Sequence, residues 1–225
     1  MNQYLEPTAI IDSDHPRIIQ FAKACTAEAG GDPRRAAVAL FLAVRDRITY
    51  DPYTPFFLPV HYRASRTLRQ GRGFCIPKSA LLCALARAAG IPARMGFATV
   101  RNHLATRQLV DYLGSDRFVY HGFAELFLDQ RWIKATPVFD ADLCDRFKVP
   151  PLDFDGIHDA VFQAFNDEDA PFMEYLADHG TYTDVPVDDI VSAWQATYGA
   201  KRVDDWIDAF NASAAARDFR SEDVA

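Results

Sequence analysis

Apolar positions in the first sixty residues recur at the spacing of amphipathic helices. The pattern predicts a helix over 15–29 that ends at a pair of glycines. A second helix is expected over 36–48, with Asp32 as its N-cap and Pro33 in its first turn. Residues 51–59 hold three prolines and predict a loop.

The middle of the chain changes from helical to strand-like spacing. Residues 78–89 are apolar on nearly every side, which predicts a central buried helix. Residues 93–100 predict a strand, and the polar, irregular stretch 101–117 predicts a loop or lid. Residues 118–128 alternate apolar and polar side chains, and 131–138 follow after a two-residue turn. Together these two segments predict a β-hairpin.

Loops with Pro150 and Pro151 follow the hairpin, and the pattern then predicts two short helices over 187–198 and 203–216. Helices, a central helix and then antiparallel strands favour an α+β fold. We expect a core over 1–150 and an extension over 151–225 that packs on the core.

Charge and composition exclude several classes of protein. The chain has 24 Lys and Arg against 31 Asp and Glu, a net charge of −7, so neither nucleic acid nor an anionic membrane is expected as a partner. No apolar run approaches the roughly 20 residues of a membrane span, and the N-terminus lacks the pattern of a secretory signal. Four scattered cysteines do not form a disulfide framework. We therefore expect a cytoplasmic protein.

A glycine-rich loop brings one cysteine to the start of the central helix. Gly71 and Gly73 precede Cys75, and Pro77 suits the first helical turn. Free backbone N–H groups and the positive end of the helix dipole favour a thiolate there, so Cys75 is the candidate nucleophile. Cys83 lies inside the apolar helix and is expected to be a core residue.

A histidine at the start of the hairpin is the candidate base. His121 could take the thiol proton of Cys75, and a third group should hold its ring. Thr136 on the partner strand and Asp140 just beyond it are the two candidates for that role. Glu125 lies too far along the strand, and we expect it to form a salt bridge or a strand-end hydrogen bond.

Three motifs carry a resemblance to a known family. Residues 73–94 contain Gly-Phe-Cys, Leu-Leu, Ala-Leu and Gly-Ile-Pro-Ala-Arg; residues 121–127 read His-Gly-Phe-Ala-Glu-Leu-Phe; residues 132–138 read Trp-Ile-Lys-Ala-Thr-Pro-Val. Over roughly 30–140 the chain resembles the transglutaminase-like superfamily, a papain-related thiol fold. The family's third motif has an aspartate where this chain has Thr136.

The resemblance implies a Cys75 nucleophile and a His121 base. It implies acyl transfer from an amide of a peptide, protein or small molecule through a thioester, with hydrolysis favoured over cross-linking and no cofactor. Because Thr136 brings no charge, Thr136 and Asp140 both stay open as the third member. The alternative is a non-catalytic binding or scaffold protein that retains the fold.

Two other kinds of site are not expected. Residues 71–79 are similar to a phosphate-binding loop, but Pro77 removes a backbone donor that such a loop needs. The six histidines show no pairing at metal-ligand spacing, and no acidic cluster has the spacing of a calcium loop. We therefore expect no metal.

Overall fold

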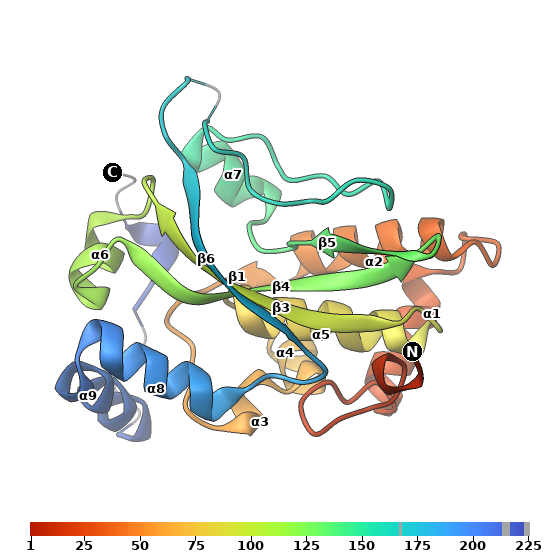
Figure 1. Cartoon of the computed structure of the whole chain (residues 1–225), viewed down its shortest axis with the longest axis horizontal. Helices are drawn as coiled ribbons and strands as arrows, with labels where there is room; N and C mark the ends of the chain where they lie inside the picture. Colours follow the sequence, from red (N-terminus) through yellow and green to blue (C-terminus); the bar gives the residue numbers. More distant parts are fainter. Residues whose placement is uncertain (167, 213–216, 223–225) are drawn as a thin grey trace.

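A four-stranded antiparallel sheet forms the centre of the molecule. The computed structural model describes residues 1–166, 168–212 and 217–222 (Figure 1). The strands lie in the order β5–β4–β3–β6, and their bounds are Arg131–Ala135, Arg117–Leu128, Ala93–Asn102 and Met173–Tyr182. With helices packed on this sheet, the α+β prediction is confirmed.

Helix α5, Cys75–Ala88, packs against β3 and β4 and is buried along almost its whole length. Its alanine and leucine side chains are enclosed on all sides because other helices cover the part that faces away from the sheet. These covering helices are α1 (Pro16–Cys25), α2 (Pro33–Arg47), α3 (Pro59–Tyr62) and α4 (Ala64–Gln70). The continuous apolar pattern of 78–89 thus reflects burial between two layers.

The glycine-rich loop before α5 holds the first turn of this helix in position. Gly71 ends α4 at φ +66, a conformation that favours glycine. The following residues form β2 (Arg72–Gly73), which pairs in parallel with β1 (Thr49–Tyr50). A side chain at Gly73 would come within 3.0 Å of the Pro77 ring. The helix begins at Cys75 itself, three residues before the predicted start.

The β4–β5 hairpin closes with Asp129 and Gln130, both at positive φ, as a tight two-residue turn requires. Near the other end of β4 the pairing with β3 shifts between Ala98 and Val100. In this bulge Tyr120, a non-glycine residue, has φ +59. The bulge interrupts the pleat immediately before His121.

Two regions predicted as loops contain regular structure. Helix α6, Arg107–Leu113, lies within 101–117 and is N-capped by Thr106, whose hydroxyl accepts the Leu109 N–H at 3.1 Å. Helix α7, Ala141–Phe147, and strand β6 lie within the stretch after the hairpin. Strand β6 is an edge strand whose side chains are mostly exposed, apolar ones such as Leu176 included, so its sequence lacks the alternation of a half-buried strand.

Helices α8 (Val187–Tyr198) and α9 (Ala200–Asn211) pack on each other, and α8 contacts β4 (Figure 1). Helix α8 matches the predicted range 187–198, and α9 begins three residues before the predicted range 203–216. Positions 213–216 of that range lie outside the described residues. Short 3₁₀ turns occupy Asn2–Tyr4 and Phe219–Ser221.

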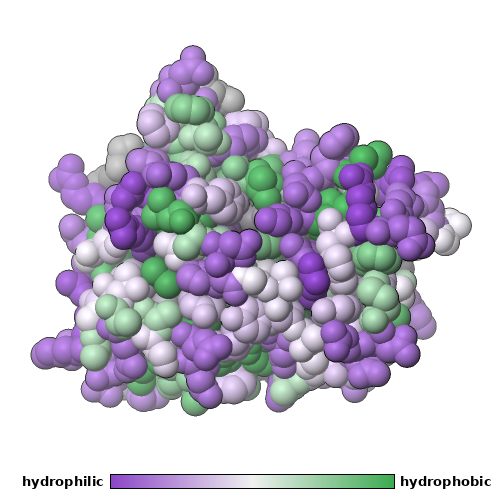
Figure 2. Space-filling model, in the orientation of Figure 1, coloured by the Kyte–Doolittle hydropathy of each residue, from purple (hydrophilic) through white to green (hydrophobic). Residues whose placement is uncertain are grey.

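On the face in Figure 2, hydrophilic residues are widely spread and hydrophobic residues gather in small patches. Within the described ranges, no helix is both long and apolar enough to cross a membrane.

Candidate active site

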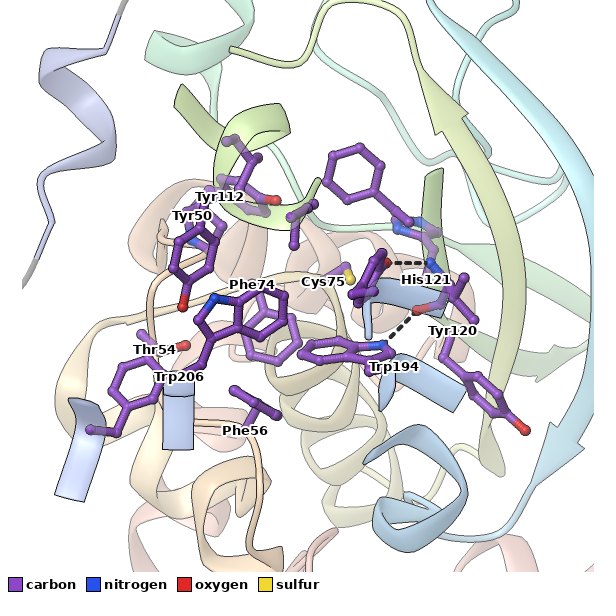
Figure 3. Close-up of a pocket in the computed structure, with 17 residues that line it drawn as sticks. Tyr50, Thr54, Phe56, Phe74, Cys75, Tyr112, Tyr120, His121, Trp194 and Trp206 are labelled. Carbon is purple, nitrogen blue, oxygen red and sulfur yellow. Dashed lines mark hydrogen bonds between the residues drawn. The ribbon is translucent and has the colours of Figure 1, made fainter. Parts of the chain in front are cut away.

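Cys75 and His121 line one pocket, although 45 residues separate them in the sequence. Cys75 stands at the start of α5 and His121 on β4 (Figure 3). The pocket encloses about 60 Å³. Most of its other lining residues carry aromatic rings, and we call it the aromatic pocket: Tyr50, Phe56, Phe74, Tyr112, Phe118, Tyr120, Trp194, Tyr198, Trp206 and Phe210.

Burial dominates the electrostatics of the cysteine. The side chain keeps partial exposure through the pocket. Burial nevertheless raises the pKa of the Cys75 thiol to about 11, although backbone N–H groups of Gly122, Ile76 and Cys75 itself oppose that rise. The helix start therefore supplies donors for a sulfur anion, as the sequence predicts, but the resting thiol keeps its proton at neutral pH.

The histidine is neutral for the same physical reason. His121 is 6% exposed, and burial lowers the pKa of its imidazole to about 4. Phe162 packs beside the ring, with the centroids 5.6 Å apart. A neutral imidazole beside a neutral thiol can accept the thiol proton as the sulfur attacks. The resting site thus holds no preformed thiolate–imidazolium pair.

The two candidate orienting residues occupy different surroundings. Thr136 follows β5 directly and is buried; its Oγ1 and the Nε2 of His121 both lack a hydrogen-bond partner among the described residues. Asp140 caps α7 by accepting the Leu143 N–H at 3.1 Å, and both its oxygens bind Arg220 at 2.7 and 2.8 Å.

The carboxylate of Asp140 is therefore engaged by the cap of α7 and by Arg220. It also accepts the Tyr50 N–H at 3.3 Å. Burial raises its pKa, but the hydrogen bonds and charge of Arg220, together with the N–H groups of Tyr50 and Leu143, hold that pKa below its usual value. Neither Asp140 nor Thr136 lines the aromatic pocket in the part of the chain that the structure describes. Which residue orients the imidazole of His121 stays a prediction.

Helix α8 secures the bulge that precedes His121. The Tyr198 hydroxyl accepts the Val119 N–H at 3.0 Å and lies 3.0 Å from the Arg117 carbonyl, to which it donates. Trp194 Nε1 donates to the Val119 carbonyl at 2.8 Å; Figure 3 draws the bond from Trp194 as a dashed line. These side chains satisfy backbone groups that the bulge removes from the ladder.

Gly122 allows β4 to approach the first turn of α5 closely. A Cβ at this position would lie 3.0 Å from Ile76 Cγ1 and 3.1 Å from Ile76 Cα. The buried Ser79 hydroxyl donates to the Gly122 carbonyl at 3.1 Å and ties the strand to the helix. Glu125, further along β4, pairs with Arg94 at 2.6 Å, one of the two roles expected for it.

The aromatic residues from α8 and α9 were not identified by sequence reasoning. Trp194, Tyr198, Trp206 and Phe210 lie in the extension predicted for 151–225, beyond the three motifs. Their amphipathic spacing indicates only that they face a core. Their place beside Cys75 depends on how the two helices fold back over β4. No group of three or more His, Cys, Asp or Glu among the described residues is placed to hold a metal ion.

The family model for the transglutaminase-like superfamily matches residues 19–137, more than half of the chain. The chain therefore belongs to this superfamily, which confirms the resemblance carried by the three motifs. No curated protein matches the sequence.

Three solved structures are similar to the chain at low identity. A protein of Cytophaga hutchinsonii proposed to be a cysteine protease gives a TM-score of 0.46 at 16% identity, covering 80% of this chain and 53% of that one. A protein of Parabacteroides distasonis proposed to be a protease gives a TM-score of 0.39 at 16% identity, covering 53% of this chain and 23% of that one. The periplasmic domain of TgpA from Pseudomonas aeruginosa, bound to ethylmercury, gives a TM-score of 0.39 at 18% identity, covering 60% of this chain and 46% of that one. This chain spans about half or less of each.

Proposed function

We propose that this member of the transglutaminase-like superfamily is a thiol-dependent acyl-transfer enzyme that hydrolyses an amide of a peptide, protein or small molecule. One observation carries the proposal: the Cys75 thiol and the His121 imidazole share one pocket, and backbone N–H groups are directed at the sulfur. A buried cysteine that served only as core, such as Cys83 within α5, would need neither a base nor a pocket.

The reaction begins with a neutral thiol and a neutral imidazole. As the Cys75 sulfur attacks the amide carbonyl, His121 accepts the thiol proton, and a new C–S bond forms. The oxyanion of this intermediate requires N–H donors, which the first turn of α5 supplies from its backbone. His121 then gives its proton to the amide nitrogen as the C–N bond breaks, leaving an amine and a thioester on Cys75.

Water completes the cycle. His121 takes a proton from the water that attacks the thioester, the C–S bond breaks, and the sulfur recovers that proton, which releases a carboxylic acid. An amine in place of water would give a new amide instead, so hydrolysis and transfer share every residue named here. We favour hydrolysis because water reaches a thioester inside a pocket of about 60 Å³ more easily than an amine carried on a protein.

A small activated ester tests the proposal. With p-nitrophenyl acetate, we expect a burst of p-nitrophenolate and an acetyl group on Cys75, located by mass spectrometry. Cys75→Ala should abolish the burst, and His121→Ala should lower its rate at neutral pH by about 10²–10⁴-fold, the usual contribution of a general base.

Two matched controls accompany these variants. Cys25→Ala removes another partly exposed thiol, and His61→Ala removes the other histidine whose pKa burial lowers to about 4. Both controls should retain the burst. Acetylation of Cys75 at equal rates with and without the His121 imidazole would refute the proposal.

A non-catalytic binding protein is the second candidate. Two observations favour it: the Cys75 thiol has a raised pKa, and His121 Nε2 has no partner among the described residues. A protein of this kind would bind its partner equally well as wild type and as Cys75→Ala, and it would show no acetyl burst.

A further inference from the structure

Two hollows of opposite character lie next to each other, and Cys75 borders one of them. None of the described residues that line the aromatic pocket is Asp, Glu, Lys or Arg. An open groove of about 650 Å³ lies next to it, and we call it the polar groove. Charged side chains of both signs line the polar groove: Asp51, Arg72, Asp111, Arg202, Asp205 and Arg217.

The two hollows adjoin. Thr54, Tyr112, Trp206 and Phe210 line both of them and form their common border, where the Tyr112 and Trp206 rings stack with centroids 4.6 Å apart. Cys75 and His121 border only the aromatic pocket. A ligand that extends across this border has the part next to the reacting atom among rings and the rest among charges.

Two polar groups of the pocket wall are already engaged by the backbone of β4. Trp194 Nε1 binds the Val119 carbonyl, and the Tyr198 hydroxyl binds Val119 and Arg117. A charged group that entered the pocket would lose its water and find no ion of opposite charge in the lining. The loss of hydration makes such a group far less favourable than an apolar one.

The volume of the pocket sets a second limit. An apolar cavity of about 150 Å³ holds benzene, and this pocket encloses about 60 Å³. A short aliphatic group fits that volume, whereas an aromatic ring requires a wall residue to move. Phe210, near the end of α9 and only partly buried, is the wall residue whose removal enlarges the space at the junction with the groove.

We propose that the substrate is an amide with a small, uncharged aliphatic group next to the reacting carbonyl, and with a polar remainder that lies in the groove. The aromatic pocket selects the first part by exclusion of charge and size. The charged side chains of the polar groove give hydrogen bonds to the second part. This inference rests on the proposed function, because it takes Cys75 as the reacting atom.

Methanethiosulfonate reagents test the selectivity of the pocket independently of catalysis. Each reagent transfers its S–R group to a thiolate, forming a disulfide and releasing methanesulfinate. We would compare R as methyl, benzyl, 2-(trimethylammonium)ethyl and 2-sulfonatoethyl, and follow Cys75 by mass spectrometry. The rate at Cys25, partly exposed in the same molecule, normalises each reagent.

We expect the methyl reagent to modify Cys75 at least about tenfold faster than either charged reagent, relative to Cys25, because both charges lose hydration in the pocket. The benzyl reagent should be slow in wild type and faster in Phe210→Ala. The control Phe165→Ala removes an exposed ring that lines neither hollow, and it should change nothing.

Several outcomes would overturn the inference. Equal relative rates for charged and methyl reagents would do so, as would a Cys75 that no reagent modifies, or a benzyl rate that Phe210→Ala leaves unchanged. The same series in His121→Ala separates the two proposals. If the reagents show the expected selectivity but the wild-type protein gives no acetyl burst, the proposed enzyme activity is refuted and the proposed selectivity of the aromatic pocket is supported. A normal burst without selectivity would refute only the inference.

Discussion

Tyr198→Phe isolates the contribution of α8 to the position of His121. The substitution removes one oxygen and leaves the ring in the aromatic pocket. The Val119 N–H loses its acceptor at 3.0 Å, and the Arg117 carbonyl loses its donor at 3.0 Å. Each unsatisfied buried group costs about 1–3 kcal/mol.

Both backbone groups are only partly buried, so water replaces some of what is lost. We therefore expect the free energy of unfolding to fall by about 1–3 kcal/mol in total, which corresponds to a decrease in Tm of roughly 2–10 °C for a chain of this length.

The same change should reduce the reactivity of Cys75. Tyr120 is held at φ +59, a conformation that costs a non-glycine residue about 1–3 kcal/mol and persists only where neighbours impose it. Without the Tyr198 hydroxyl, β4 can relax toward a regular pleat, which turns side chains at the bulge toward the other face. We expect the acetyl burst to slow and its pH profile to change.

Calorimetry and burst kinetics on the same samples measure both effects. Tyr4→Phe is the matched control, since the Tyr4 hydroxyl forms no hydrogen bond with the described residues and its ring packs on Trp132, outside the residues that line the pocket. If Tyr198→Phe keeps both the wild-type Tm and the wild-type burst profile, α8 does not position His121 and the reasoning is refuted.

Three further predictions follow from the same contacts. Burial lowers the pKa of His121 to about 4, so the imidazole of the unfolded chain takes up a proton at a higher pH than that of the folded chain. We therefore expect the His121 imidazole to lower the free energy of unfolding by about 3 kcal/mol between pH 6.5 and 4, measured by urea titration. An equal drop in His121→Gln would contradict this. Gly122→Ala should slow the acetyl burst roughly tenfold, since its Cβ would meet Ile76 at 3.0 Å and separate β4 from α5; an unaltered burst rate would exclude that effect. Arg220→Met should destabilise the protein by about 1–3 kcal/mol, because it leaves the buried Asp140 carboxylate without its cation. Adding Asp140→Asn to this variant should recover most of the lost stability. Additive effects of the two substitutions in this double-mutant cycle would show that the pair is not coupled.

Local patterns predicted the elements that bury a continuous apolar face or carry capping residues. Asp32 begins α2 by accepting the N–H groups of Arg34 and Arg35, and the pair Asp129–Gln130 closes the hairpin. Strand β6 was missed because its side chains are mostly exposed, and its existence depends on pairing with β3, about 80 residues away. Helix α6 was missed because 101–117 is polar and irregular in sequence; in the structure Thr106 caps this helix.

Short-range spacing and motifs predicted the fold class, the superfamily and the candidate pair Cys75 and His121, because these features depend on residues that are close in the sequence. Tertiary structure decided what lies around them. Burial, which is a property of the whole packed molecule, sets both groups neutral at rest. The Arg220 side chain, distant in sequence, engages Asp140. Helices α8 and α9 supply aromatic residues to the aromatic pocket, and no local pattern in the sequence encodes the position of these helices over β4. Long-range packing brings such groups together, and only the folded chain specifies it.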